Sequence, residues 1–116
     1  MVAPAYVPDK AHIIKLSFDP QAGHEQAGWR PAVVLSPAAY NKIGLAIVVP
    51  ITNQVKGYPF EVPVPAGLAT TGVILADAIR NVDWKARRAR FVEIIPAGPL
   101  KAVQGHLAML LGQLGS

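Results

Sequence analysis

The sequence predicts a mainly β fold, a small barrel-like antiparallel sheet closed by one C-terminal helix. Short apolar or alternating runs recur between turns rich in glycine and proline, of which the 116 residues contain 10 and 11. The only convincing helical pattern lies at the end of the chain. The length fits a single domain over residues 1–116, and we find no internal repeat, linker or low-complexity tract.

The first three expected strands surround the most polar part of the chain. Residues 12–18 alternate, with Ile14 and Leu16 on the same face as Phe18. Residues 31–36 begin with Pro31 and continue as an apolar run with two β-branched valines, which is typical of a buried strand. Residues 45–51 are almost wholly apolar, so we expect burial on both faces.

Four shorter strands are expected in the second half. Residues 60–64 form one of them, and Pro63 should confine it to an edge or a bulge. After a turn, residues 73–75 start another strand. Residues 79–83 should be extended, and residues 89–94 should make the last strand.

Two helical segments are expected. Residues 36–41 could form one helical turn with Ser36 as its cap and Pro37 at its first position. Pro99 opens the C-terminal helix, in which Gly105 costs about 1 kcal/mol relative to alanine. Apolar residues at helical spacing give this helix one face, made of Leu100, Val103, Leu107, Leu110, Leu111 and Leu114.

Composition restricts the class of protein. Hydrophobic residues make up 52% and charged residues 16%, which excludes a disordered chain. No apolar run approaches the roughly 18 residues of a membrane helix, and the N-terminus lacks a secretory signature, so we expect a soluble cytoplasmic protein without membrane partners. The absence of cysteine excludes disulfides and thiolate metal ligands. A net charge of +4 weakly favours polyanionic partners.

Several common chemistries do not fit. His12, His24 and His106 lack the close pairing typical of zinc sites, so we expect no metal. There is no glycine-rich loop of the kind that binds nucleotide phosphates, so we expect no cofactor. Ser36 lacks the flanking glycines of a nucleophile elbow and suits a helix cap better.

A polar loop at residues 23–31 is the first candidate site. Its chemically active side chains are His24, Glu25, Gln26, Trp29 and Arg30. Pro31 opens the strand that follows, so we expect Arg30 at the mouth of the loop, where a rigid strand presents acid, base and cation together. The alternative is a solvated turn in which Arg30 makes a structural salt bridge.

A second polar loop at residues 52–59 follows a buried strand. Its possible phosphate-binding side chains are Thr52, Asn53, Gln54, Lys56 and Tyr58. The alternative is an ordinary polar turn.

A basic run completes the candidates. Its cations are Arg80, Lys85, Arg87, Arg88 and Arg90. Trp84 and Phe91 lie among them, and rings beside cations are the pattern expected of a surface for single-stranded nucleic acid. A solvated basic face that pairs with the acidic residues of a partner fits equally well.

These motifs together resemble the MazF/PemK family of toxin endoribonucleases. The matching segments are residues 18–20 (FDP), 23–28 (GHEQAG), 30–37 (RPAVVLSP), 49–52 (VPIT), 56–62 (KGYPFEV), 72–77 (GVILAD) and 83–87 (DWKAR). They span nearly the whole chain in the family's order. The resemblance implies an SH3-like barrel with a terminal helix, a homodimer, and metal-free cleavage of single-stranded RNA at short sequences.

The resemblance also implies roles for individual residues. Arg30 and Thr52 match the core of the family's site, and Glu25 matches the acid of its loop. In one branch a loop histidine and an aspartate have roles, and these match His24 and Asp77. RNA supplies its own nucleophile, the ribose 2′-hydroxyl, so Glu25 or His24 would act as base while Arg30 and Thr52 stabilise the phosphorane.

Further residues are expected to bind RNA: Gln26, Trp29, Asn53, Gln54, Lys56, Tyr58, Arg80, Lys85 and Arg87. The sequence departs from the family pattern at a few positions. Leu75 replaces an arginine of that branch, and Ala78 replaces a common glutamine. Ala11 and His12 replace a Gly-Asp pair, and Lys15 replaces an aromatic residue.

The implied function is a sequence-specific, metal-independent toxin that cleaves mRNA and leaves 5′-hydroxyl ends with 2′,3′-cyclic phosphate or 3′-phosphate. A cognate antitoxin with an acidic, disordered tail would neutralise it. Two alternatives remain open: a CcdB-like gyrase poison with the same barrel, and a catalytically inactive RNA-binding module.

Overall fold

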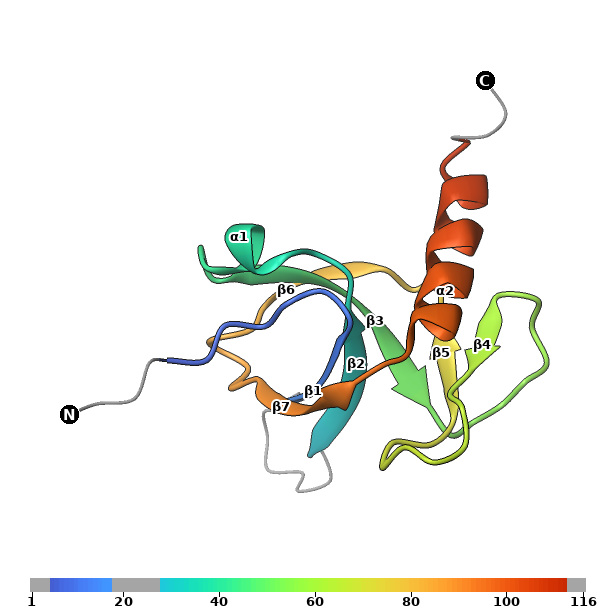
Figure 1. Ribbon diagram of the computed structural model, residues 1–116, viewed down its shortest axis with the longest axis horizontal. Helices are drawn as coiled ribbons and strands as arrows, with labels where there is room; N and C mark the ends of the chain where they lie inside the picture. The colour runs from blue at the N-terminus through green and yellow to red at the C-terminus, as the bar shows by residue number, and fades with distance from the viewer. Residues whose placement is uncertain (1–4, 18–27, 113–116) are drawn as a thin grey trace.

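The computed structural model describes residues 5–17 and 28–112 (Figure 1). Its strands are β1 (His12–Ser17), β2 (Trp29–Val34), β3 (Leu45–Thr52), β4 (Glu61–Pro63), β5 (Val73–Leu75), β6 (Arg80–Asp83) and β7 (Arg90–Ile94). Its helices are α1 (Ala38–Asn41) and α2 (Ala97–Leu110). The predicted mainly β fold with a C-terminal helix is therefore confirmed.

The strands form one antiparallel sheet in the order β4-β5-β3-β2-β1-β7, with β6 also paired to β3. The pairings among the described strands leave β4 and β7 at the two ends, so the sheet is not closed. Pro63 lies in the edge strand β4, as predicted, where its missing N–H costs no bond of the sheet.

Each face of the sheet carries an apolar cluster, as the alternation in β1 predicted. Ile13 belongs to the cluster that Val103 of α2 covers, whereas Ile14 and Leu16 belong to the opposite cluster. Figure 1 shows α2 standing beside β4 and β5. The predicted core residues Phe18 and Leu114 lie outside the described residues.

Two central strands differ in detail from the prediction. β2 begins at Trp29 and not at Pro31, because Leu16 and Ser17 of β1 pair with Arg30 and Trp29. Arg30 therefore lies within a strand and not at the mouth of a loop. β3 alternates largely between buried and half-buried residues, so full burial on both faces was wrong.

The cap predicted for α1 was also wrong. The N-cap residue is Pro37, without a side-chain cap bond. The Ser36 hydroxyl donates instead to Oδ1 of the buried Asn41. The Asp9 carboxylate accepts the backbone N–H of Ala38 at 2.9 Å, and that bond helps to lower the Asp9 pKa.

The C-terminal helix begins earlier than predicted and is less covered. α2 starts at Ala97, which places Pro99 inside its first turn. Val103 is fully buried, but Leu110 and Leu111 are 47% and 75% exposed. The predicted apolar face is therefore covered only toward the start of the helix. No helix among the described residues is long and apolar enough to cross a membrane.

The departures at Ala11 and His12 have visible consequences. Ala11 adopts a φ of 76°, a conformation that favours glycine. The His12 ring stacks on Tyr6, accepts its hydroxyl hydrogen bond at 2.7 Å, and meets Phe91 edge-on. Burial, with a contribution from the Asp9 charge, raises the pKa of Tyr6 to about 12. His12 thus ties the N-terminal segment to the sheet.

Candidate active site

Arg30 and Thr52 lie in one open cavity of about 300 Å³. The residues that line it are Gly28, Trp29, Arg30, Pro31, Ile51, Thr52 and Asn53. β2 and β3 are antiparallel neighbours in which Ala32 pairs with Pro50, so the start of β2 lies beside the end of β3. The fold therefore brings together the two residues expected at the core of the site.

Arg30 is available for a ligand. Its residue is exposed, and within residues 5–17 and 28–112 its side chain makes no hydrogen bond or ion pair. The structural salt bridge considered as an alternative is not formed in this part of the chain. A guanidinium presents a rigid fork of donors that matches phosphate oxygens.

The Thr52 hydroxyl is held in a way that leaves its proton free. Its oxygen accepts the backbone N–H of Gln54 at 3.1 Å. The hydroxyl hydrogen can therefore point into the cavity and donate to an anion. Together, Thr52 and Arg30 make the cavity a site rich in donors, which suits a phosphate group.

Gly72 fixes the position of Thr52 from the neighbouring strand. Val73 of β5 pairs with Thr52, and the preceding Gly72 has a φ of +114°. A Cβ atom there would come closer than 3.0 Å to the carbonyl carbon and oxygen of Thr52, and it would lie 2.9 Å from Asn53 Oδ1. Only glycine allows this close approach.

A second cavity of about 240 Å³ adjoins the first. Its lining residues are Lys15, Trp29, Pro31, Asn53, Ala69, Thr70, Thr71 and Val92, so Trp29, Pro31 and Asn53 belong to both cavities. The Arg90 guanidinium lies over the Trp29 ring, 4.2 Å from its centroid.

The wall of this second cavity is held by Glu93. Its carboxylate accepts the backbone N–H groups of Ala69 and Thr70 and the Thr70 hydroxyl, at 2.8–3.0 Å. Burial raises the pKa of Glu93, but these three hydrogen bonds outweigh it, and the pKa ends below its ordinary value.

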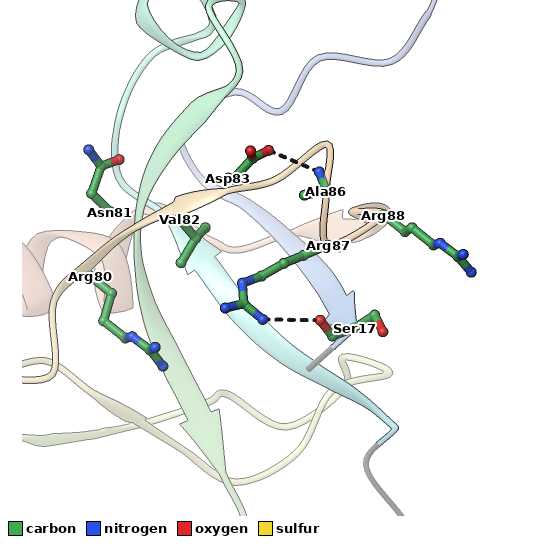
Figure 2. Close-up of a pocket in the computed structure, with 8 residues that line it drawn as sticks. All are labelled: Ser17, Arg80, Asn81, Val82, Asp83, Ala86, Arg87 and Arg88. Atoms are coloured by element: carbon green, nitrogen blue, oxygen red, sulfur yellow. Dashed lines mark hydrogen bonds between the residues drawn. The ribbon is translucent and has the colours of Figure 1, made fainter. Parts of the chain in front are cut away.

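A larger basic cavity of about 670 Å³ lies beside β6 (Figure 2). It is lined by Ser17, Arg80, Asn81, Val82, Asp83, Ala86, Arg87 and Arg88. Arg87 Nη1 donates to the Ser17 carbonyl at 3.3 Å, and Figure 2 shows Arg88 directed away from the others. Two of the predicted RNA-binding cations, Arg80 and Arg87, therefore share one concave surface.

The aromatic residues of the basic run do not behave as predicted. Trp84 is only 5% exposed, and its Nε1 donates to the Asn41 carbonyl at 2.8 Å. It is a core residue, so the expectation that it stacks on bases was wrong. Phe91 is 47% exposed but packs against His12 and Tyr6. Trp29, which is half-buried, has the Arg90 guanidinium over its ring.

Other predicted residues lie away from Arg30 and Thr52. Asp77 is exposed and follows β5, which runs away from the Thr52 end of β3. Four of the predicted RNA-binding residues are exposed and line neither of the two neighbouring cavities: Gln54, Lys56, Tyr58 and Lys85. The Glu61 carboxylate accepts the backbone N–H groups of Lys56 and Gly57, which holds this loop against the start of β4. The RNA contacts of these four residues stay predictions.

His24, Glu25 and Gln26 lie outside the described residues. Sequence reasoning did not single out Thr71 or Gly72. The Thr71 hydroxyl donates to Asn53 Oδ1 at 3.0 Å. Gly72 opens the matching segment 72–77, but neither that motif nor a glycine before a short strand indicates a contact with Thr52.

Known proteins share the sequence and the fold of this chain. "Endoribonuclease toxin MazF" of Escherichia coli (strain K12) is 46% identical over 108 residues, which cover 92% of this chain and 96% of that protein. "Endoribonuclease PemK" of Escherichia coli is 38% identical over 108 residues, covering 89% and 81%. A crystal structure of MazE-MazF from Deinococcus radiodurans superposes with a TM-score of 0.88 at 55% identity, covering 93% of this chain and 98% of that one.

The family described as "PemK-like, MazF-like toxin of type II toxin-antitoxin system" matches residues 9–111. This match includes every described strand and both helices. The chain belongs to the PemK-like, MazF-like toxin family of type II toxin-antitoxin systems.

Proposed function

We propose that this protein is an endoribonuclease toxin that cleaves single-stranded RNA at short sequences without a metal ion, and that a cognate antitoxin neutralises it. The observation that carries the proposal is the shared cavity of Arg30 and Thr52, which presents donors and no carboxylate among its described residues. The relatives are named endoribonucleases, which supports the same activity here.

The residues suit attack by the ribose 2′-hydroxyl on the adjacent phosphorus. The 2′-oxygen forms a bond to phosphorus, the bond to the 5′-oxygen breaks, and the products are a 2′,3′-cyclic phosphate and a 5′-hydroxyl. Arg30 stabilises the charge of the phosphorane with its fixed fork of donors. Thr52 donates its hydroxyl hydrogen to the same phosphate. Glu25 or His24 takes the proton of the nucleophile.

Two other functions are less well supported. A gyrase poison with a related fold needs no phosphate site, whereas the shared cavity of Arg30 and Thr52 presents donors that suit a phosphate. A catalytically inactive RNA-binding module would fit the departures at Leu75 and Ala78. Neither residue lines the cavity of Arg30, so these departures leave its donors in place.

The antitoxin part of the proposal rests on charge. Among the described residues the basic cavity beside β6 is lined by three arginines and one aspartate, and the whole chain has a net charge of +4. An acidic, disordered antitoxin tail complements such a surface. The antitoxin encoded beside this toxin should suppress cleavage, and its affinity should fall as salt rises. An affinity that does not change with salt would contradict the electrostatic account.

A homodimer in the cytoplasm completes the proposal. Apolar side chains stay exposed around the end of α2, and Ile79, Leu110 and Leu111 are between 44% and 75% exposed. Ile79 and Leu111 line a groove of about 270 Å³ with other apolar residues. Covering such a surface with a second copy removes apolar area from water. Sedimentation of the free toxin should give a dimer mass, and a monomer at all concentrations would contradict this.

The test of the active site is single-turnover cleavage of a short RNA by Arg30→Ala. If Arg30 stabilises the phosphorane, the rate should fall by a factor on the order of a hundred or more. Arg30→Lys should recover little, because one ammonium cannot copy the bidentate fork. Lys101→Ala, which removes an exposed cation from α2, is the control for net charge.

Melting temperature and RNA binding are recorded for each variant. An exposed arginine contributes at most about 1 kcal/mol to folding through a surface pair, so Arg30→Ala should stay folded. Cleavage by Arg30→Ala at the wild-type rate would show that the site is misassigned. Unfolding of the variant would show that Arg30 serves the fold.

A further inference from the structure

We infer that Glu93 is a positioning residue for RNA cleavage, whose carboxylate closes the open side of the sheet and so holds the Thr52 hydroxyl at the phosphate. Glu93 does not line the cavity of Arg30 and Thr52, and it acts through residues 69–72, the segment that precedes β5. The role of Thr52 at the phosphate rests on the proposed function. Neither the resemblance nor the sequence pattern singled out Glu93.

The sheet is open between β7 and the segment before β5. β7 pairs with β1 at one end of the strand order, whereas β5 pairs with β3 and β4. In the part of the chain that the structure describes, no backbone hydrogen bond joins β7 to this segment. The Glu93 carboxylate joins them instead, by accepting the backbone N–H groups of Ala69 and Thr70 and the Thr70 hydroxyl at 2.8–3.0 Å. A side chain therefore does here what a paired strand does in a closed barrel.

The segment that Glu93 holds reaches the active site at two points. The Thr71 hydroxyl donates to Asn53 Oδ1 at 3.0 Å. Gly72 comes so close to Thr52 that a Cβ atom on it would lie less than 3.0 Å from the Thr52 carbonyl oxygen and carbon. This backbone contact leaves no space to absorb a displacement, so a shift of the segment moves Thr52 as well.

The tie depends on a charged carboxylate. Although burial raises the pKa of Glu93, its hydrogen bonds to Ala69 and Thr70 bring the pKa below its ordinary value, so the group is ionised at neutral pH. Hydrogen bonds to a charged acceptor are about twice as strong as those between neutral groups. Glu93→Gln keeps the size of the side chain, but its NH₂ group replaces one acceptor and opposes a backbone N–H. This variant should therefore release the segment from β7.

The first measurement follows the Thr52 hydroxyl without RNA. The backbone N–H of Gln54 donates to Thr52 Oγ1 at 3.1 Å, so the Gln54 amide resonance reports the position of this hydroxyl in an NMR spectrum. Glu93→Gln should shift the Gln54 resonance more than it shifts the amide resonances of α2. A Gln54 resonance that moves no more than those of α2 would overturn the inference.

Asp9→Asn is the matched control. The Asp9 carboxylate also accepts two backbone N–H groups, those of Lys10 and Ala38 at 2.8 and 2.9 Å, and its pKa is lowered as well. It ties the N-terminal segment to α1 and does not contact residues 69–72 by any hydrogen bond of the described residues. The control removes the same charge and the same kind of bond, and it should leave the Gln54 resonance in place.

The second measurement is single-turnover cleavage of a short RNA at rising toxin concentration, at a temperature where all variants are folded. A misplacement of about 1 Å in a catalytic group lowers a rate about a hundredfold, so a smaller shift of Thr52 in Glu93→Gln should lower the maximal rate about tenfold. The toxin concentration that gives half of this rate should change by less than about twofold, because the hydroxyl acts on the transition state. Asp9→Asn should keep the wild-type rate.

A double-mutant cycle separates positioning from a general structural effect. Thr52→Ala removes the group that Glu93 positions, so adding Glu93→Gln to Thr52→Ala should lower the rate by less than about twofold further. Thr70→Val removes one of the three hydrogen bonds and keeps the shape of the side chain, and it should cause a smaller loss of rate than Glu93→Gln. Thr70→Ser keeps the hydroxyl and should recover most of that loss. Thr70→Val carries the test if Glu93→Gln does not fold.

Three results of the cleavage assay would overturn the inference. They are an equal loss of rate from Glu93→Gln with and without Thr52→Ala, a loss that Asp9→Asn shares, and weaker RNA binding with an unchanged maximal rate. A wild-type protein that does not cleave RNA would overturn the proposed function instead. In that case the Gln54 resonance still decides whether Glu93 holds Thr52 in place, because it is measured without RNA.

Discussion

Replacing Gly72 with alanine should damage the active site more than it damages the fold. Gly72 and Gly67 both have positive φ values, +114° and +97°, beyond the left-handed helical region, so alanine is strained at either position. The space around them differs. An added Cβ at Gly67 meets nothing within 4 Å, whereas at Gly72 it comes closer than 3.0 Å to the Thr52 backbone.

Residue 72 and the Thr52 carbonyl must therefore move apart by several tenths of an ångström or more in Gly72→Ala. A misplacement of about 1 Å in a catalytic group can lower the rate about a hundredfold. Backbone overpacking adds about 1–3 kcal/mol to the loss of stability. We expect Gly72→Ala to cleave RNA at least tenfold more slowly than Gly67→Ala when both rates are corrected for the folded fraction. Equal rates and equal melting temperatures would refute the idea that Gly72 positions Thr52.

Two further predictions concern stability. Ala11 has a φ of 76°, so Ala11→Gly should leave the free energy of unfolding unchanged or raise it by up to about 1 kcal/mol, whereas Ala102→Gly in α2 should lower it by about 1 kcal/mol. Denaturant unfolding checks this, and similar losses in both variants would show that Ala11 is not strained. The lowered pKa of Glu93 means that the native state releases this proton more readily than the unfolded state. The stabilisation by the Glu93 carboxylate is complete above the ordinary pKa of about 4.3 and is lost as the pH falls through the native pKa. Glu93→Gln should therefore lower the melting temperature at neutral pH, and should lower it by less near pH 3. A difference that does not change with pH would contradict this assignment.

The sequence pattern was sufficient for most strands because each of β1 to β6 contains at least one buried residue. The bounds of β5 agree with the predicted residues 73–75. The start of β2 did not follow from the pattern, because a proline was taken as its first residue while pairing with β1 extends it to Trp29. The burial of Trp84 depends on the Asn41 carbonyl, 43 residues away, and no local pattern encodes that contact.

The candidate site was predictable only where a motif carried it. Arg30 and Thr52 follow from the resemblance, and the pairing of β2 with β3 explains why they meet. The contact between Asn53 and Thr71 joins residues 18 positions apart through the pairing of β3 with β5. The sequence alone offered Asn53 as one polar residue among several in a loop, and it offered no reason to consider Thr71.

Cleavage of a mixed-sequence RNA in the presence of EDTA tests the central claim most directly. The wild-type toxin and Arg30→Ala are incubated in parallel, and the new ends are sequenced and tested for phosphate. We predict that the wild type cuts at a short recurring sequence despite the chelator and leaves 5′-hydroxyl ends, while Arg30→Ala cuts at least a hundredfold more slowly. Ends that carry a 5′-phosphate, or activity that EDTA abolishes, would contradict the mechanism proposed for Arg30 and Thr52.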